Sequence, residues 1–590
     1  MRLLVHASAK EMVLEVQPGK NLLEALRENH LDLVAPCGGR GKCGKCRIQV
    51  QKGDLPVTDT DKRFLREEEL KDGWRLACVA VAAEDLEIQL SSEKKLSIIK
   101  SYMNPREDTL QGAANDFTLC LVETAKIKDS VGFAGFVDAL RKLFPGRTIS
   151  LPAIRKCSGF LAEGEAFYQE AQFQVLLTQN EIVDILAGEQ KPHPACGAAV
   201  DIGTTTIGLE LVDLITGEKL ASHAVINTQR QYGTDVVTRI QNAGEGKLTD
   251  LRDCVTKDIL KGLNELVRQG GVEKNHVRRV AFSGNTTMMH LLLAIPCKSL
   301  GLFPFIPAVT GFLTLPFQDI FNSADFTCPA TIMPGISTYV GSDITAGILF
   351  CGGLRREKPS LLIDLGTNGE MALFDGKRVL CTSTAAGPAF EGGNISCGVA
   401  SIPGAICKTV YENASFIPET IGDIYPPVGI CGSGVLDIGA QMVRHELIDE
   451  TGLLEDENFD NGVPIAPDSN IYFTQKDVRE LQLAKSAVRA GMEVLLQQAG
   501  VGYDAVEQVF LAGGFGFHVD LEHAGAIGLI PEELRDKVFV VGNSSLGGCV
   551  KILLEQDAER EIQDLIDVSE EINLSNDKSF NDMFMEYMYF

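Results

Sequence analysis

Residues 35–47 read APCGGRGKCGKCR, and residues 74–81 follow with WRLACVAV. Together the two stretches contain four cysteines with the spacing C-x5-C-x2-C-x31-C: Cys37, Cys43, Cys46 and Cys78. Four thiolates are the ligand set that a [2Fe–2S] cluster requires. Glycines at positions 38, 39, 41 and 44 let the backbone wrap closely around such a cluster, with N–H groups free to donate to its sulfurs. The stretch therefore predicts an iron–sulfur loop.

The residues around the loop predict the fold that carries it. Residues 2–7 (RLLVHA) and 11–16 (EMVLEV) alternate as two strands, and residues 21–30 (NLLEALRENH) have apolar side chains at helical spacing. Two strands, a helix and then a cysteine loop is the β-grasp order of [2Fe–2S] ferredoxins. Plant-type ferredoxins have C-x4-C-x2-C, so the x5 gap differs by one residue and is similar to the adrenodoxin and putidaredoxin branch.

Two other uses of these cysteines stay open at this point. A zinc site would need a second C-x2-C pair or a nearby histidine at ligand spacing, and the sequence has neither. Buried free thiols are the second alternative. We expect the [2Fe–2S] cluster.

Three later stretches have the pattern of a nucleotide site. Residues 198–211 (AAVDIGTTTIGLEL) and 360–374 (SLLIDLGTNGEMALF) each place an aspartate, a glycine and hydroxyl or amide side chains in the turn between two strands. Backbone N–H groups in such a turn can wrap phosphate oxygens, and the carboxylate can reach Mg²⁺. Residues 506–517 (VEQVFLAGGFGF) run from a strand into glycines that allow an adenosine to approach the backbone. Two related turns predict two subdomains that face each other across a cleft.

This ordered set of motifs resembles the acetate and sugar kinase, Hsp70 and actin superfamily of ATPases. On that resemblance Asp201 and Asp364 are expected to organise Mg²⁺ and the phosphates, and Glu370 and Glu391 are further candidates, for positioning the attacking water. The expected nucleotide-binding residues are Gly203, Thr204, Thr205, Gly366, Thr367, Asn368, Gly432, Ser433, Gly513, Gly514 and Phe515. Asp343 either lines the cleft or caps a helix. The sequence contains no P-loop motif and no G-x-G-x-x-G that opens a helix after a strand, as a dinucleotide site would need. A doubly wound sheet without a nucleotide is the remaining alternative.

Composition excludes several classes of protein. The chain has 590 residues and a net charge of −26, which argues against a nucleic-acid partner. Sixteen cysteines, mostly scattered singly after residue 78, are typical of reduced cytosolic thiols. The sequence has no run of eighteen apolar residues that would predict a membrane span, and its N-terminal stretch lacks the pattern of a secretory signal. We expect a cytoplasmic protein.

The chain is expected to be a multi-domain α/β and α+β protein. The predicted parts are a β-grasp ferredoxin domain (1–92), a polar linker (93–115), a small α/β middle domain (116–192), a duplicated actin-like ATPase domain (193–556) and a C-terminal tail (557–590). In the middle domain we predict strands at 117–125 and 173–179 and helices at 136–144 and 180–188. The tail sequence DMFMEYMYF (582–590) is expected to pack on the last domain, with a dimer contact as the alternative.

The whole chain, from residue 2 to about 556, resembles one family, the reductive activators of corrinoid proteins. Beyond the motifs above, the resemblance depends on residues 227–240 (NTQRQYGTDVVTRI), 280–293 (VAFSGNTTMMHLLL), 385–393 (AAGPAFEGG), 431–437 (CGSGVLD) and 475–491 (QKDVRELQLAKSAVRAG). It implies a [2Fe–2S] cluster, ATP and Mg²⁺ as cofactors. It also implies a protein that reduces the inactive Co(II) corrinoid of a methyltransferase system to Co(I). The implied partners are that Co(II) corrinoid protein and a low-potential electron donor, a ferredoxin or flavoprotein, and the resemblance allows a homodimer.

Three other functions fit parts of the pattern. A small-molecule kinase could carry the ferredoxin as a redox sensor, and a non-enzymatic electron carrier could keep a vestigial nucleotide fold. An ATP-driven electron donor to another low-potential enzyme is the third. Such donors usually bridge a [4Fe–4S] cluster across a dimer, whereas this chain has its own predicted [2Fe–2S] site.

Overall fold

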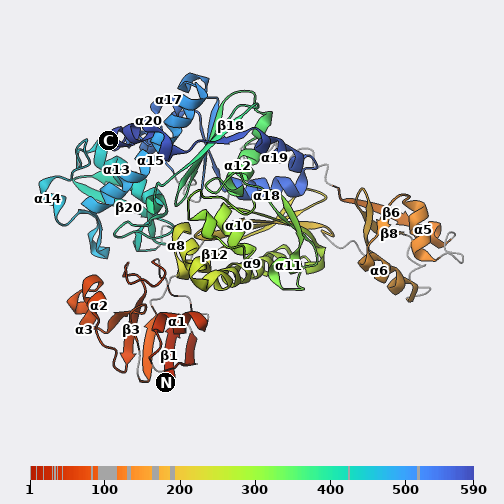
Figure 1. The fold of residues 1–590 in the computed structure, drawn as a ribbon, viewed down its shortest axis with the longest axis horizontal. Helices are drawn as coiled ribbons and strands as arrows, with labels where there is room; N and C mark the ends of the chain where they lie inside the picture. The colour runs from red at the N-terminus through yellow and green to blue at the C-terminus, as the bar shows by residue number, and fades with distance from the viewer. Residues whose placement is uncertain are drawn as a thin grey trace.

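The computed structural model describes residues 2–7, 10–17, 19–29, 31, 33, 35, 37–42, 44–81, 84–90, 116–128, 135–162, 172–186, 193–422, 425–513 and 519–590 (Figure 1). The expected linker at 93–115 lies outside these residues, and the domain boundaries given above stay a prediction. In the described part of the chain, every helix is too short or too polar to cross a membrane.

The N-terminal domain is built on a five-stranded sheet of order β2-β1-β5-β3-β4. Strand β1 pairs antiparallel with β2 and parallel with β5, which is the expected β-grasp arrangement. Helix α1 begins after Asn21, whose side chain accepts the N–H groups of Leu23 and Glu24, and its leucines are buried. The elements are Arg2–Ala7 (β1), Lys10–Glu15 (β2), Leu22–Glu28 (α1), Arg47–Lys52 (β3), Asp59–Phe64 (α2), Glu67–Lys71 (α3), Trp74–Leu76 (β4) and Leu86–Leu90 (β5).

The small middle domain has a four-stranded sheet of order β6-β8-β9-β7. The two predicted strands and the first predicted helix are confirmed, but the predicted helix at 180–188 is wrong. That segment forms strand β9, which pairs antiparallel with β8 and buries Ile182 and Ile185. The elements are Thr118–Glu123 (β6), Thr124–Lys128 (α4), Phe136–Leu143 (α5), Thr148–Ile149 (β7), Leu151–Ala162 (α6), Gln172–Leu177 (β8) and Glu181–Leu186 (β9).

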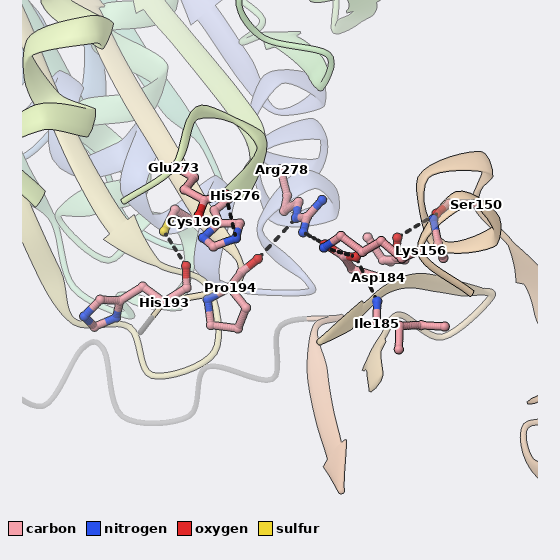
Figure 2. A network of polar contacts seen from close by, with 12 residues as sticks. Ser150, Lys156, Asp184, Ile185, His193, Pro194, Cys196, Glu273, His276 and Arg278 are labelled. Carbon is pink, nitrogen blue, oxygen red and sulfur yellow. Dashed lines mark hydrogen bonds and ion pairs between the residues drawn. The ribbon is translucent and has the colours of Figure 1, made fainter. Parts of the chain in front are cut away.

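A buried ion-pair network ties the middle domain to the rest of the chain (Figure 2). The Asp184 carboxylate on β9 accepts from Arg278 Nη2 at 2.5 Å and lies 2.6 Å from Lys156 Nζ. Arg278 also donates to the carbonyl of Pro194 at 3.2 Å. Burial alone would raise the pKa of Asp184, but Lys156 and Arg278 outweigh it and hold that pKa below its usual range.

The large C-terminal part contains two six-stranded sheets with repeated topology. Their orders are β12-β11-β10-β13-β15-β14 and β25-β24-β16-β17-β18-β26. In each sheet three antiparallel strands (β10 to β12, β16 to β18) continue into a parallel neighbour, β13 beside β10 and β24 beside β16. The repetition confirms the predicted duplicated fold.

The first sheet and its helices span residues 196–350. Its strands are Cys196–Ile202 (β10), Thr206–Asp213 (β11), Lys219–Ile226 (β12), Val277–Gly284 (β13), Leu313–Pro316 (β14) and Pro329–Ile332 (β15). Its helices are Thr228–Tyr232 (η2, a 3₁₀ turn), Val236–Asn242 (α8), Leu248–Gly270 (α9), Thr286–Leu292 (α10), Phe317–Phe321 (α11) and Ser342–Phe350 (α12).

The second sheet and its additions span residues 360–590. The strands of the sheet are Ser360–Leu365 (β16), Gly369–Phe374 (β17), Val379–Thr384 (β18), Gln508–Ala512 (β24), Val538–Gly542 (β25) and Ser569–Glu571 (β26). Smaller sheets use Ala405–Glu412 (β19), Ser415–Thr420 (β20), Gly429–Ile430 (β21), Val463–Ala466 (β22) and Ile471–Phe473 (β23). The helices are Gly432–Arg444 (α13), Asp456–Phe459 (α14), Gln475–Ala499 (α15), Leu521–Ala526 (α16), Glu532–Arg535 (α17), Ser544–Leu554 (α18), Ala558–Asp567 (α19) and Lys578–Glu586 (α20).

Helices α12 and α18 pack together near the centre of this unit, between the two sheets (Figure 1). Glycines make the close contact. A Cβ added at Gly347 would lie 2.8 Å from the Ser544 hydroxyl, and one at Gly548 would lie 2.2 Å from the Ala346 carbonyl. Helices α12 and α18 therefore hold the two subdomains closely together.

The C-terminal residues pack on the last domain, as predicted. Lys485, buried on α15, donates to the carbonyl oxygens of Tyr587 at 2.7 Å and Tyr589 at 2.5 Å. Its Nζ also lies 4.7 Å from the centre of the Phe590 ring. The end of the chain is therefore part of the core around α15.

Candidate functional site

The cluster loop, residues 37–46, depends on glycine for its backbone path. Gly38, Gly39, Gly41 and Gly44 all have positive φ. At Gly44 (φ +66°) an added Cβ would also lie 2.7 Å from the Phe64 side chain, so only glycine fits there. In the described part of the loop, residues 37–42 and 44–46, the backbone thus takes conformations that glycine alone adopts readily.

Three of the four expected cluster ligands are described. The Cys78 thiol donates to the buried Cys46 sulfur, which lowers the pKa of Cys46 to about 7 and raises that of Cys78. The charge of Cys37 raises the Cys78 pKa further, while the N–H of Gly41 donates to Cys78 and opposes that rise. Cys43 lies outside the described residues, and within them no three ligating side chains are grouped closely enough to hold a metal ion. The thiol pair and the N–H donor suit a thiolate-bound cluster.

The first phosphate turn, residues 201–206, joins β10 to β11. The carboxylate of Asp201 accepts from Asn543 Nδ2 at 2.8 Å and from Ser545 Oγ at 2.7 Å, both at the start of α18. Asn285 Nδ2 donates to the Thr204 hydroxyl at 3.2 Å. A Cβ at Gly203 would lie 2.5 Å from the Thr206 carbonyl, so the turn requires glycine there. Elements far apart in the sequence thus fix Asp201 and the turn together.

The second phosphate turn, residues 364–370, joins β16 to β17 in the same way. Asn368 Nδ2 donates to the Glu370 carboxylate at 3.1 Å, and the hydroxyl of Ser383 reaches the same carboxylate at 3.4 Å. Gly366 lies beside Glu391, because a Cβ added there would be 3.6 Å from Glu391 Oε1.

Glu391 connects the two turns. Its Oε2 atom accepts from Thr367 Oγ1 of the second turn at 3.1 Å and from Thr205 Oγ1 of the first at 3.4 Å. The two sets of predicted phosphate-binding hydroxyls therefore face each other.

Five carboxyl groups around the turns have raised pKa values. Burial is the main cause for each of them: Asp201, Asp343, Asp364, Glu370 and Glu391. The charge of Asp201 helps to raise the pKa of Asp343 to about 7, and the charges of Asp343, Asp201 and Glu391 help to raise that of Asp364 to about 8. Asp343 lies in the first turn of α12, whose N-cap residue is Gly341, and the charge of Asp201 acts on its carboxyl group. Of the two expected roles, it therefore lies at the site and does not cap the helix. A group of acids that repel one another in this way is suited to a divalent cation.

The expected adenosine residues are only partly described. Gly513 (φ +105°) directly follows β24, and a Cβ added there would lie 2.3 Å from the Leu365 carbonyl and 3.0 Å from Asp364 Oδ1. Gly513 therefore touches the second turn. Gly514 and Phe515 lie outside the described residues. Gly432 and Ser433 form the buried first turn of α13, and the Ser433 hydroxyl lies 3.3 Å from Cys431 Sγ.

Sequence analysis missed several side chains that hold the turns. Asn543 and Ser545 had no assigned role, although both are near the start of a helix that follows a strand, a common place for groups that bind anions or their ligands. Arg239, which belongs to the segment quoted for the family resemblance, donates through Nη2 to the Thr204 carbonyl at 2.5 Å.

The fold and these two sites define the class of protein: a [2Fe–2S] ferredoxin domain joined in one chain to an ATPase-type nucleotide fold. Family models agree with this. The 2Fe-2S iron-sulfur cluster binding domain matches residues 5–83, the RACo middle region matches residues 196–356, and the C-terminal domain of RACo, the ASKHA domain, matches residues 358–590.

Relatives of similar length agree as well. The chain is 29% identical to the corrinoid activation enzyme RamQ of Eubacterium limosum, over 94% of this chain and 93% of RamQ. It is 28% identical to the [Co(II) methylated amine-specific corrinoid protein] reductase of Methanosarcina barkeri, over 66% of this chain and 76% of that protein. A solved structure, the reductive activator for corrinoid, iron-sulfur protein, matches with 29% identity and a TM-score of 0.70, covering 100% of this chain and 98% of its own. The chain belongs to the RACo family of reductive activators of corrinoid proteins, as the sequence motifs predicted.

Proposed function

We propose that this protein takes up one electron at a [2Fe–2S] cluster and delivers it, at the expense of ATP, to the Co(II) corrinoid of a methyltransferase system. The single observation that carries the proposal is the pairing in one chain of the cluster loop with two opposed phosphate turns that share Glu391. The cluster supplies one-electron chemistry when bound. A low-potential ferredoxin or flavoprotein is the proposed electron donor.

The thiolates of Cys37, Cys43, Cys46 and Cys78 would hold the cluster. The Gly41 N–H, which donates to the Cys78 sulfur, would stabilise negative charge on that sulfur and so favour reduction. The glycines of the loop keep bulky side chains away from the cluster, which shortens the path for an electron to the surface.

The two turns would bind Mg-ATP between them. Hydroxyls of Thr204, Thr205 and Thr367 are proposed to donate to phosphate oxygens. Asp201, held in place by Asn543 and Ser545, and Asp364 are proposed to bind Mg²⁺ or its waters. Glu391 is the proposed acceptor for a proton from the attacking water, because it already accepts hydrogen bonds from both turns.

Energetics explain why ATP is needed. Plant-type clusters have potentials near roughly −400 mV, and the Co(II)/Co(I) couple of a corrinoid protein is expected to lie lower. For a one-electron transfer, a tenfold change in the equilibrium constant corresponds to a potential difference of about 59 mV, or about 1.4 kcal/mol. About 10 kcal/mol from ATP hydrolysis would therefore offset a potential difference of roughly 0.4 V. ATP carries no electron, so the coupling has to be conformational, and closure of the two turns on the nucleotide is the natural two-state element.

The proposal is tested with the anaerobically reconstituted protein and a Co(II) corrinoid protein from the same source. We expect the Co(I) absorbance to appear only with reductant, cluster and Mg-ATP together. Cys43→Ser should abolish cobalt reduction while ATP still binds, and Asp201→Ala should abolish it while the cluster spectrum is unchanged.

Two results would overturn this function. If no Co(I) forms with or without ATP, the activator assignment is wrong. If ATP turnover instead rises with a small hydroxylated metabolite and ignores the corrinoid protein, the protein is a redox-sensing kinase.

A further inference from the structure

The ferredoxin domain is docked on the ATPase-type domain through its cluster loop. In Figure 1 the N-terminal domain lies beside α8. Arg40, between the first two cluster cysteines, donates to the Gln241 side chain and lies 3.3 Å from a carboxylate oxygen of Glu245. The Arg27 guanidinium stacks 4.8 Å from the centre of the Tyr232 ring. Two arginines of the ferredoxin domain thus contact residues of the ATPase-type domain.

The contact at Gly38 is close. Its φ is +67°, and an added Cβ would lie 2.6 Å from Asn242 Nδ2 and 3.2 Å from the Tyr232 carbonyl. Asn242 Nδ2 itself donates to that carbonyl. The backbone next to Cys37 therefore rests directly on the end of α8.

Residues of α8 and of the stretch before it also bind the first phosphate turn. They donate hydrogen bonds to three consecutive backbone carbonyls of that turn. The Gly203 carbonyl accepts from Asn227 Nδ2 at 2.9 Å, and that of Thr205 accepts from the Asn227 N–H at 2.9 Å. The Thr204 carbonyl accepts from Arg239 at 2.5 Å. When backbone N–H groups of a turn wrap a phosphate, the carbonyls point away from it, so these three bonds report on how the turn is arranged.

Arg239 is a buried cation next to the first phosphate turn. Its side chain is fully buried, and its other donors reach the Gly233 carbonyl at 2.8 Å, Gln229 Oε1 at 3.1 Å and Met288 Sδ at 3.2 Å. Within the described residues no carboxylate lies at ion-pair distance from it. Burial lowers its pKa to about 9, and the charge of Asp235 opposes that fall only in part. A buried charge that is only partly compensated is costly, and a phosphate bound in the adjacent turn would offset that cost.

The backbone is interrupted between α8 and α9. Between α8 and α9 the backbone passes through a π-helical turn at residues 243–247, in which Gly246 has φ +93°. Interruptions of this kind allow a helix to tilt relative to its neighbour. Helix α8 can therefore shift while α9 stays packed on its sheet.

We propose that residues 227–245, here called the coupling segment, transmit the presence of nucleotide at the first turn to the ferredoxin domain, and that nucleotide binding loosens the docked cluster loop. The inference depends on the proposed function, because it supplies the step by which ATP frees the cluster to reach cobalt in another protein. Arg239 is then a positioning residue, which acts on the ferredoxin domain through α8.

Nucleotide binding and docking of the cluster loop are thermodynamically linked. If nucleotide weakens docking, then weaker docking must strengthen nucleotide binding by the same factor. Arg40→Ala removes a partly exposed contact of modest worth, so we expect Mg-ATP analogue binding to tighten about two- to fivefold. The matched control is Arg268→Ala, which removes an exposed ion pair with Glu265 on α9. This variant should bind the Mg-ATP analogue with the affinity of the wild type. Equal or weaker binding by Arg40→Ala would overturn the proposal.

Hydrogen exchange of the anaerobic holoprotein provides the second measurement. A saturating non-hydrolysable ATP analogue should speed exchange of residues 37–42 and 236–245 by about tenfold in the wild type. Arg239→Lys keeps the charge but loses the forked donors, so it should bind the analogue while its cluster loop no longer responds. An unresponsive wild-type loop, or a variant that responds like the wild type, would refute the coupling. Because neither measurement uses a corrinoid protein, the coupling and the proposed function can fail separately.

Discussion

Thr205 and Glu391 lie 186 residues apart in the chain, yet their Oγ1 and Oε2 atoms are 3.4 Å apart, across the two subdomains. Thr367 donates to the same carboxylate oxygen at 3.1 Å. A phosphate that enters between the turns would compete for both hydroxyls, because each has a single proton to donate. Glu391 would then lose two donors at the moment the substrate binds, which makes it a stronger base.

Glu391→Gln should therefore affect turnover more than binding. A glutamine keeps the shape and can still accept from the threonines, but it cannot take a proton from water. We expect ATP turnover to fall about 100-fold with analogue affinity within about threefold of the wild type. Steady-state ATPase assays and calorimetry measure the two quantities. Glu419→Gln, at an exposed position of β20, is the control, and an equal loss in both variants would remove Glu391 from the mechanism.

Ser545→Ala tests how Asp201 is held. Burial raises the pKa of Asp201, and the hydrogen bonds from Ser545 and Asn543 oppose that rise. Removing one bond to a charged group costs about 1.5–3 kcal/mol, so the pKa should rise further. We expect the pH at which Mg-nucleotide binding is half-maximal to move upward by about one unit. Ser415→Ala, whose hydroxyl donates to the Glu412 carbonyl on the surface, should leave the profile in place.

The carboxyl groups at the turns predict a pH dependence of stability. Asp343 and Asp364 have raised pKa values of about 7 and about 8. A raised pKa means that their contribution to stability is fully present below the unfolded value of about 4 and is lost as pH rises through the folded values. Without divalent cation, the melting temperature should therefore fall between about pH 4 and 8. Mg²⁺ with nucleotide should reverse the fall and should bind more tightly as pH increases. A melting temperature that stays flat over this window with and without Mg²⁺ would contradict the cation site.

Local motifs account for what the sequence predicted. The cysteine loop and the two turns are each contained in a short stretch, so residue type and spacing are enough to recognise them. The partners that hold them are not local. Asn543 is 342 residues away from Asp201, and only the packing of α18 against the first sheet brings them together.

The one wrong element has a simple cause. In the segment EIVDIL (181–186), Ile182, Ile185 and Leu186 fit helical spacing as well as a buried strand. Periodicity cannot distinguish the two in so short a run. The segment forms a strand because it pairs with β8 and because its β-branched residues favour a strand.

The single tryptophan offers a probe of the cluster. Trp74 is the only tryptophan in the chain and lies on β4, four residues before Cys78. A bound [2Fe–2S] cluster absorbs in the region where tryptophan emits, so reconstitution should quench the fluorescence of Trp74 by more than half. Cys78→Ser should prevent both the quenching and the visible absorbance, whereas Cys120→Ser in the middle domain should permit both. Full quenching with stoichiometric zinc and no iron would disprove the cluster.

The contact between Arg278 and Asp184 predicts how the middle domain detaches. Arg278→Ala would leave Asp184, only 3% exposed at its side chain, with Lys156 as its remaining cation. Breaking a buried pair in this way costs about 3–5 kcal/mol, so urea unfolding should show an earlier transition for the middle domain, with the nucleotide affinity unchanged. Because the pKa of Asp184 is lowered, the stabilisation is present above the unfolded value of about 4 and is lost as pH falls through the folded one. The difference between wild type and variant should therefore disappear in acid. Arg141→Ala, which breaks an exposed pair with Asp138, should change the unfolding curve little at any pH, and a difference between Arg278→Ala and wild type that persists in acid would show that the contact acts through packing instead of charge.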